Sequence, residues 1–119
     1  MNLTTFLQLL AQLRVLHWQT KSYGEHKALG KAYDALDGLV DQFVEVHSGK
    51  YGNTLAKTNF SFSVQNYKDA NSLGVINTAI NYLTVELPTT LGQGDTDLLN
   101  IRDEMLSVLN QTKYLLRLQ

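Results

Sequence analysis

The feature that most constrains this chain is the spacing of its apolar residues, which recur three and four positions apart in four separate stretches. That spacing gathers apolar side chains on one face of an α-helix, whose period is 3.6 residues. The stretches predict helices over about residues 2–21, 24–48 and 67–87, and a fourth helix from about residue 95 onward. A chain of 119 residues has room for one domain, 1–119, and four helices would use most of it. The sequence therefore predicts a single all-α domain.

Each predicted helix has one face expected to point into the core. In chain order, the predicted core residues are Leu3, Phe6, Leu10, Leu13 and His17; Leu29, Ala32, Tyr33, Leu36, Leu39, Val40 and Phe43; Leu73, Ile76, Ile80, Leu83 and Leu87; and Leu98, Ile101, Met105, Val108, Thr112 and Leu115. Ser22 and Glu25 have the spacing of a capping box at the start of the second helix. Asp95 or Thr96 fits the cap of the fourth helix.

Residues 49–66, between the second and third predicted helices, lack helical periodicity. Phe60, Phe62 and Val64 alternate with serines, which is typical of an extended segment with one apolar edge. Fully extended, the segment could span about 50–60 Å, whereas a helix of about 24 residues is about 36 Å long. The segment can therefore run the length of a bundle. This predicts two helical hairpins joined by a long crossover, the ferritin-like form of the four-helix bundle. An up-and-down bundle with a loose middle loop is the alternative.

Charge and composition exclude several classes of function. The net charge is −1, and Lys and Arg are scattered singly, which argues against DNA binding and against a polybasic membrane anchor. The chain has no cysteine, which excludes disulfides, thiolate zinc sites and thiol catalysis. Its N-terminal stretch lacks a signal-peptide pattern and is too short to span a membrane. We therefore expect a cytoplasmic protein.

Two pairs of residues are candidates for metal binding. His17 continues the buried face of the first helix, as a ligand or as an ordinary core histidine, and His26 lies in the first turn of the second helix. Asp41 and Glu45 are one helical turn apart, about 5–6 Å, and could chelate one cation or simply form a solvated acidic edge. His26 and Asp41 are fifteen residues apart, roughly 22 Å along one helix. A site that uses both must therefore lie between two chains whose second helices run antiparallel about a two-fold axis.

The same residues resemble a known family, the Dps mini-ferritins. The resemblance is carried by Leu16-His17-Trp18, by His26, and by Asp41-Gln42-Phe43-Val44-Glu45. It implies an intersubunit iron site with one or two metals, in which His17 and His26 of one chain face Asp41 and Glu45 of its partner. It further implies oxidation of Fe²⁺ by peroxide or oxygen, a two-fold dimer at minimum, and iron storage in a dodecameric cage.

A second interpretation remains open, in which the chain is a non-catalytic ferritin-like structural or assembly protein with a degenerate metal site. Gly30 favours it, because Dps proteins usually have an acidic ligand four residues after the second histidine. The compact, Asn-rich chain also resembles ferritin-like proteins encoded by tailed phages, which would place it in a bacterial host or a virion. Whether the chain is a ferroxidase is left undecided by the sequence.

Overall fold

Four α-helices make up most of the computed structural model, which describes residues 2–53 and 59–118. Residues 54–58 of the predicted crossover lie outside the described residues. The helices are α1 (Leu3–Gln19), α2 (Tyr23–Tyr51), α3 (Ser72–Asn81) and α4 (Thr96–Leu116). No strand occurs in the described parts of the chain, so the all-α prediction is confirmed.

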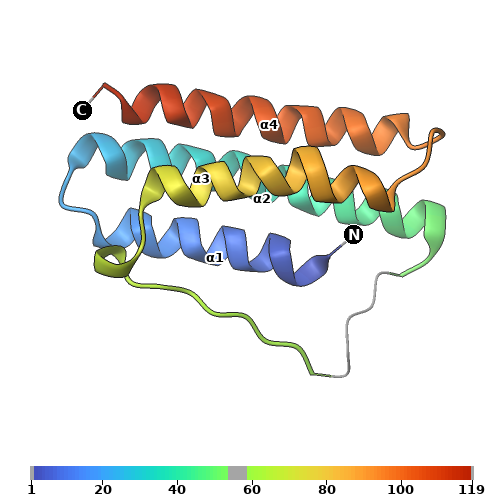
Figure 1. Ribbon diagram of the computed structural model, residues 1–119, viewed down its shortest axis with the longest axis horizontal. Coiled ribbons are helices and arrows are strands. Elements are labelled where there is room, and N and C mark those ends of the chain that lie inside the picture. The colour runs from blue at the N-terminus through green and yellow to red at the C-terminus, as the bar shows by residue number, and fades with distance from the viewer. Residues whose placement is uncertain (1, 54–58, 119) are drawn as a thin grey trace.

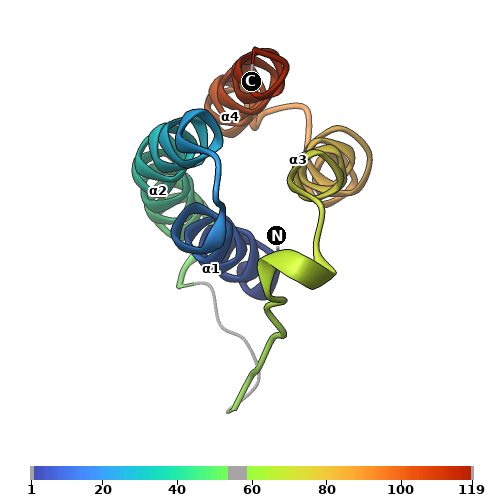
Figure 2. The same ribbon diagram turned by 90° about the vertical axis from the view of Figure 1, so that its left-hand side faces the viewer.

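The helices form two hairpins around a common core (Figures 1 and 2). A tight link at residues 20–22 joins α1 to α2, and α4 runs back beside α3. Helices α2 and α3 point in the same direction, so the chain between them returns from one end of the bundle to the other (Figure 1). That connection is the long crossover expected from the length of the linking segment.

Apolar faces of all four helices build the core. The largest fully buried side chains are Phe6, Leu13, Leu16, Leu29, Leu36, Phe43, Ile76, Leu83, Leu87, Leu98, Met105 and Leu109. Phe6 packs at a tilt against Phe43 with ring centroids 5.5 Å apart, and edge-on against Tyr82 at 5.8 Å. These contacts join α1, α2 and the turn that directly follows α3. Most of the predicted inward residues are therefore confirmed, although several at the edges of the stripes are only partly buried.

Three glutamines of α1 fasten the crossover to the bundle. Their bonds are Gln8 Nε2 to Ser63 O (3.3 Å), Gln12 Nε2 to Gln65 O (3.0 Å), Gln65 N to Gln12 Oε1 (2.9 Å), Gln19 Nε2 to Asn66 Oδ1 (3.0 Å) and Tyr67 N to Gln19 Oε1 (2.7 Å). The primary amide of Gln12 pairs with both backbone groups of Gln65, as a neighbouring strand would. These glutamines interrupt the apolar face of α1 because the extended segment beside them needs hydrogen-bond partners.

The predicted third helix over 67–87 is wrong in its boundaries. A single 3-10 turn, η1 (Tyr67–Asp69), is followed by a break, and α3 starts only after Asn71, whose side chain accepts from the Gly74 amide at 2.9 Å. With the helix beginning there, Leu73 is 47% exposed, contrary to the prediction that it faces the core. Asparagine is a favoured N-cap because its side-chain oxygen satisfies a free amide of the first turn.

A wider helical turn follows directly after α3. Tyr82–Glu86 (η2) form a π-helical turn, and Leu87–Thr90 (η3) form a 3-10 turn that contains Pro88. A proline has no amide proton and its ring presses on the carbonyl four residues earlier, so an ordinary α-helix cannot continue through it. Prolines and π-helical turns are both recognised causes of a bend in a helix.

No helix in the described residues is long and apolar enough to cross a membrane.

Candidate functional site

His17 and His26 form a stacked pair at the end of the bundle where α1 turns into α2. Their ring centroids are 3.9 Å apart and the ring planes differ by 14°. His17 Nδ1 lies 2.7 Å from the backbone oxygen of His26, and His26 Nδ1 lies 2.8 Å from the backbone oxygen of His17. The resemblance to Dps proteins implies that both residues serve one site, but the sequence did not predict that their rings would stack.

These reciprocal bonds fix where the ring protons sit. A carbonyl oxygen only accepts hydrogen bonds, so each Nδ1 must carry the proton and donate it. In the neutral ring, the lone pair is then on Nε2. A histidine that binds a metal usually donates its other ring N–H to a carbonyl or carboxylate, which orients the ring. The backbone of each histidine supplies that orienting acceptor for the other.

Gly30 makes room for the ring of His17. A Cβ atom at this position would stand 2.7 Å from His17 Cε1 and 3.0 Å from His17 Nδ1, closer than real contacts allow. The glycine that the sequence analysis found in place of an acidic residue is therefore required by the histidine that packs on it. Any side chain here would displace the ring.

The histidine pair lines an open cavity of about 1100 Å³. Arg14, Lys27 and Lys31 line the same cavity, and Asp34 is the one carboxylate among the described lining residues. The Arg14 guanidinium lies 3.8 Å from the centre of the Tyr33 ring, which holds its side chain in place by a cation–π contact. The cavity is thus positively charged, which suits a partner that brings carboxylates.

Asp41 and Glu45 lie on α2, one turn apart and exposed. In a single chain they are well separated from the histidines, as the length of the helix predicts. Within residues 2–53 and 59–118, no three or more His, Asp or Glu side chains come close enough to hold a metal ion. The four predicted ligands therefore fall into two separate groups: the histidine pair, which the fold assembles, and the carboxylate pair, which faces outward.

His47 is the third histidine of the chain. It lies on α2 with its ring centroid 5.0 Å from that of Tyr51 and 6.5 Å from that of Phe43. Burial lowers the pKa of His47. It stands far along α2 from the stacked pair and lies outside the candidate site.

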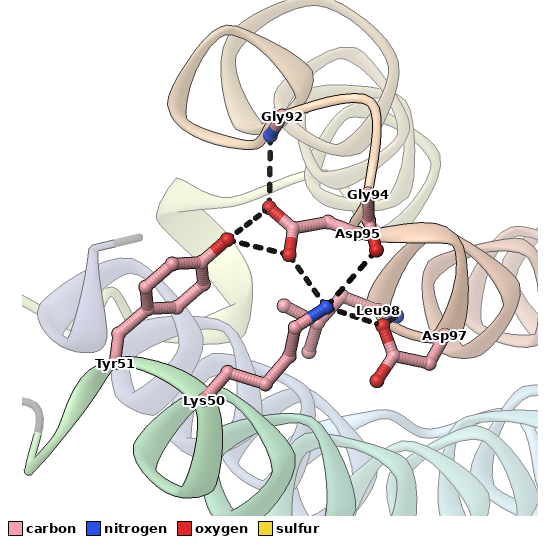
Figure 3. A network of polar contacts seen from close by, with 7 residues as sticks. All are labelled: Lys50, Tyr51, Gly92, Gly94, Asp95, Asp97 and Leu98. Carbon is pink, nitrogen blue, oxygen red and sulfur yellow. Dashed lines mark hydrogen bonds and ion pairs between the residues drawn. The ribbon is translucent and has the colours of Figure 1, made fainter.

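A polar network that the sequence did not predict joins α2 to the loop before α4 (Figure 3). The carboxylate of Asp95 is buried. It accepts from the Gly92 amide at 2.8 Å and from the Tyr51 hydroxyl at 2.6 Å, and it pairs with Lys50 at 2.7 Å. Lys50 also donates to Asp97 at 2.8 Å. The sequence marked Asp95 only as a helix cap, because nothing local reveals a partner more than forty positions away.

The network shifts the acid–base behaviour of its members. Hydrogen bonds from the Gly92 amide, Lys50 and Tyr51 hold the pKa of the Asp95 carboxyl well below its usual range. Hydrogen bonds to Asp95 and Asp97 raise the pKa of Lys50. The pair is thus held in its charged form, and it clamps the end of α2 to the start of α4.

Glu25 stabilises the turn that carries the histidines. Its amide donates to Ser22 Oγ at 3.2 Å, which confirms the Ser22 half of the predicted capping box. Its carboxylate accepts from the hydroxyls of Thr20 and Tyr67. Burial alone would raise the pKa of this carboxyl, but the hydroxyl hydrogen bonds outweigh it and keep the pKa below its usual value. The α1–α2 turn is therefore joined to the end of the crossover.

A comparison with protein families matches residues 17–116 to a family of unknown function, DUF5856. The chain belongs to the DUF5856 family. No curated protein and no solved structure matches it.

The DUF5856 match begins at His17 and takes in His26, Asp41 and Glu45. Both parts of the candidate site therefore lie within the range matched to this family, whose description assigns no activity. The function must be argued from the geometry of the site.

Proposed function

We propose that this DUF5856 chain is a ferritin-like protein that pairs with a second copy of itself and binds Fe²⁺ between the two. The ligands are His17 and His26 of one copy and Asp41 and Glu45 of the other. The observation that carries the proposal is the reciprocal hydrogen bonding of the histidines, which leaves both Nε2 atoms as the ligating nitrogens. Imidazole and carboxylate ligands together suit Fe²⁺.

The charges on α2 support an antiparallel second copy. Lys27 and Lys31 are one turn apart at one end of the helix, and Asp41 and Glu45 are one turn apart towards the other, all exposed. Antiparallel α2 helices can therefore align Lys27 with Glu45 and Lys31 with Asp41 at the same time. The alignment brings carboxylates to a cavity whose charged lining residues are mainly cations, and it does so twice about the two-fold axis.

The spacing of the rings favours two cations over one. Parallel rings 3.9 Å apart hold their nitrogen lone pairs in separate planes, so each ring suits its own ion. Paired metals in enzymes lie about 3.5–4 Å apart and share a bridging carboxylate, for which Glu45 of the second copy is the candidate. Two Fe²⁺ ions together supply the two electrons that reduce one peroxide. The ferric product would then be stored as mineral if the dimers assemble into a cage.

The hairpin arrangement is consistent with a ferritin-like bundle. Ferritin-like folds have one long crossover between two helical hairpins. Here the crossover runs alongside α1 and is held by Gln8, Gln12 and Gln19.

The competing function is a non-catalytic assembly protein with the same fold. One observation favours it: the stacking and hydrogen bonds of the histidines also lock the α1–α2 turn, which is a sufficient structural role. In addition, the ring of His17 occupies the space of the acidic ligand that Dps proteins place at position 30. Under this interpretation, His17 and His26 contribute to stability and bind no iron.

Anaerobic titration separates the two functions. Iron-free protein is titrated with Co²⁺ as a spectroscopic substitute for Fe²⁺, and then with Fe²⁺ followed by peroxide. The iron-binding function predicts visible Co²⁺ bands and a ferric absorbance rise faster than in buffer, both lost in Asp41→Asn and His26→Ala. The variant Asp103→Asn, which removes an exposed carboxylate on α4, is the matched control and keeps both signals. If the ferric absorbance of the wild type rises no faster than in buffer and no Co²⁺ bands appear, the iron-binding function is wrong and the assembly function is favoured.

A further inference from the structure

A second cavity, of about 400 Å³, lies between α1 and α3. Figure 2 shows these two helices as the pair on the side that the crossover approaches. The cavity does not include the histidine pair, and it is lined by side chains from all four helices. Ligand pockets in proteins are about 300–1,000 Å³. The cavity is therefore large enough for a small molecule.

The inner surface of this cavity is apolar. It is formed by core side chains, among them Phe6, Leu36, Val40, Leu83 and Met105. Two small residues of α3, Gly74 and Ala79, are among its lining residues. A leucine or isoleucine at such positions would normally fill the interior of a bundle. A void lined in this way favours an apolar guest over water, which needs two to four polar partners.

The rim of the cavity is polar but contains no positive charge. Gln8, Gln65, Asn71 and Thr78 offer hydrogen bonds, Asp69 contributes a carboxylate, and no Lys, Arg or His is among the described lining residues. An anionic head group would meet Asp69 without any compensating cation. An uncharged hydrogen-bonding group would find amide and hydroxyl partners.

The crossover builds one wall of the cavity. Gln65 is held against α1 because its backbone amide and carbonyl both pair with the side chain of Gln12, which is 2% exposed. The cavity also borders the π-helical turn, since Tyr82 and Leu83 line it. Such turns inside helices are frequent at functional sites. The extended crossover and the π-helical turn thus both border this cavity.

We propose that this cavity binds an uncharged amphiphile, a molecule with an apolar chain or ring system and one hydrogen-bonding end. The apolar part lies among Phe6, Leu36 and Met105, and the polar end lies at the rim near Gln65 and Asn71. Carboxylic acids of the same chain length bind more weakly because of Asp69. The site is separate from the iron site and does not depend on it.

The test uses N-phenyl-1-naphthylamine, an uncharged dye that fluoresces in apolar surroundings, with decanol and decanoate as competitors. The purified full chain is expected to bind the dye saturably at one site, with decanol displacing it better than decanoate. In Asp69→Asn, decanoate is expected to displace the dye nearly as well as decanol does. No saturable binding, or decanoate displacing the dye as well as decanol from the wild type, would overturn the proposal.

Variants that fill the cavity test the proposal in a second way. Ala79→Leu places a larger side chain in the space, and is expected to weaken dye binding about tenfold or more while leaving the unfolding midpoint equal or higher. Asn77→Leu adds the same residue type on the exposed face of α3 and should leave binding unchanged. Gly74→Leu serves as a second filling variant, because an added Cβ meets only ordinary contacts with Asn71 at 3.6–4.0 Å. Unchanged dye binding in both filling variants would contradict the assignment.

Discussion

The imidazole of His17 lies on the backbone of Gly30 so closely that even a methyl group at position 30 would stand 2.7 Å from the ring. The glycine and the histidine are therefore a matched pair, one on each helix of the first hairpin. This relationship explains why α2 has a glycine at a position where it lowers helix stability by about 0.5–1 kcal/mol relative to alanine. It also means that the orientation of the candidate ligand depends on a residue that cannot bind metal itself.

Gly30→Ala is accordingly expected to harm the site. The added methyl must displace His17, and overpacking of this kind typically costs about 1–3 kcal/mol, which outweighs the gain in helix propensity. If the histidines bind metal, displacing the ring should weaken Co²⁺ affinity about 10–100-fold. Urea unfolding and anaerobic Co²⁺ titration measure the two effects.

Gly49→Ala is the control for this substitution, because a methyl there meets nothing within 4 Å. It should leave metal affinity unchanged and stability equal or slightly higher. A Gly30→Ala protein as stable as Gly49→Ala and with wild-type Co²⁺ affinity would show that the contact between His17 and Gly30 is not as described.

Gln12→Leu tests the attachment of the crossover. The substitution leaves the amide and carbonyl of Gln65 without their partner, and each of these partly buried hydrogen bonds contributes about 0.5–1.5 kcal/mol to stability. Amide hydrogen exchange at Gln65 should become faster, and the urea midpoint should fall. Gln8→Leu, which removes only one longer and more exposed bond, should have the smaller effect. Equal effects in the two variants would contradict the role given to Gln12.

Acid should weaken the fold through Asp95. Its hydrogen bonds lower its pKa in the folded chain below the ordinary value of 3.8, so the unfolded chain takes up a proton at higher pH than the folded chain. The contribution of the ionised Asp95 carboxylate to the stability of the fold is therefore fully present well above pH 3.8. It is lost as the pH falls through and below that value. Urea midpoints measured from pH 7 to pH 3 should decline for the wild type.

Asp95→Asn should be less stable than the wild type at pH 7, and its decline towards pH 3 should be shallower, because the titrating group is gone. Asp103→Asn removes an exposed carboxylate and should keep the steep decline. If Asp95→Asn and the wild type lose stability in parallel, the acid sensitivity comes from other groups.

The sequence predicted the helices well wherever apolar spacing was regular. The faces of α1, α2 and α4 come from that spacing alone, although His17, which was predicted to lie in the core, is only partly buried. The third helix was less well predicted, because Asn71 begins α3 later and the chain continues after Asn81 as a π-helical turn and then a 3-10 turn that contains Pro88. Local signals such as a cap or a proline displace a boundary that periodicity leaves undefined.

Tertiary relationships could not be predicted from the sequence. The stacking of His17 on His26 depends on the geometry of the tight α1–α2 turn, and the salt bridge between Lys50 and Asp95 joins residues far apart in the chain. Their spacing in the sequence carries no trace of either contact. The distance between His26 and Asp41, in contrast, follows from helix geometry alone, and it already required that a shared site be intersubunit.

Mixing two inactive variants tests the central claim most directly. One chain carries His17→Ala and His26→Ala, the other carries Asp41→Asn and Glu45→Gln, and the two are co-expressed with different tags and purified as mixed oligomers. In each mixed dimer one site has all four ligands and the other has none, so about half of the wild-type Co²⁺ capacity should return, although neither parent binds. Mixed dimers that form but bind no Co²⁺, like either parent, would contradict a site shared between two chains.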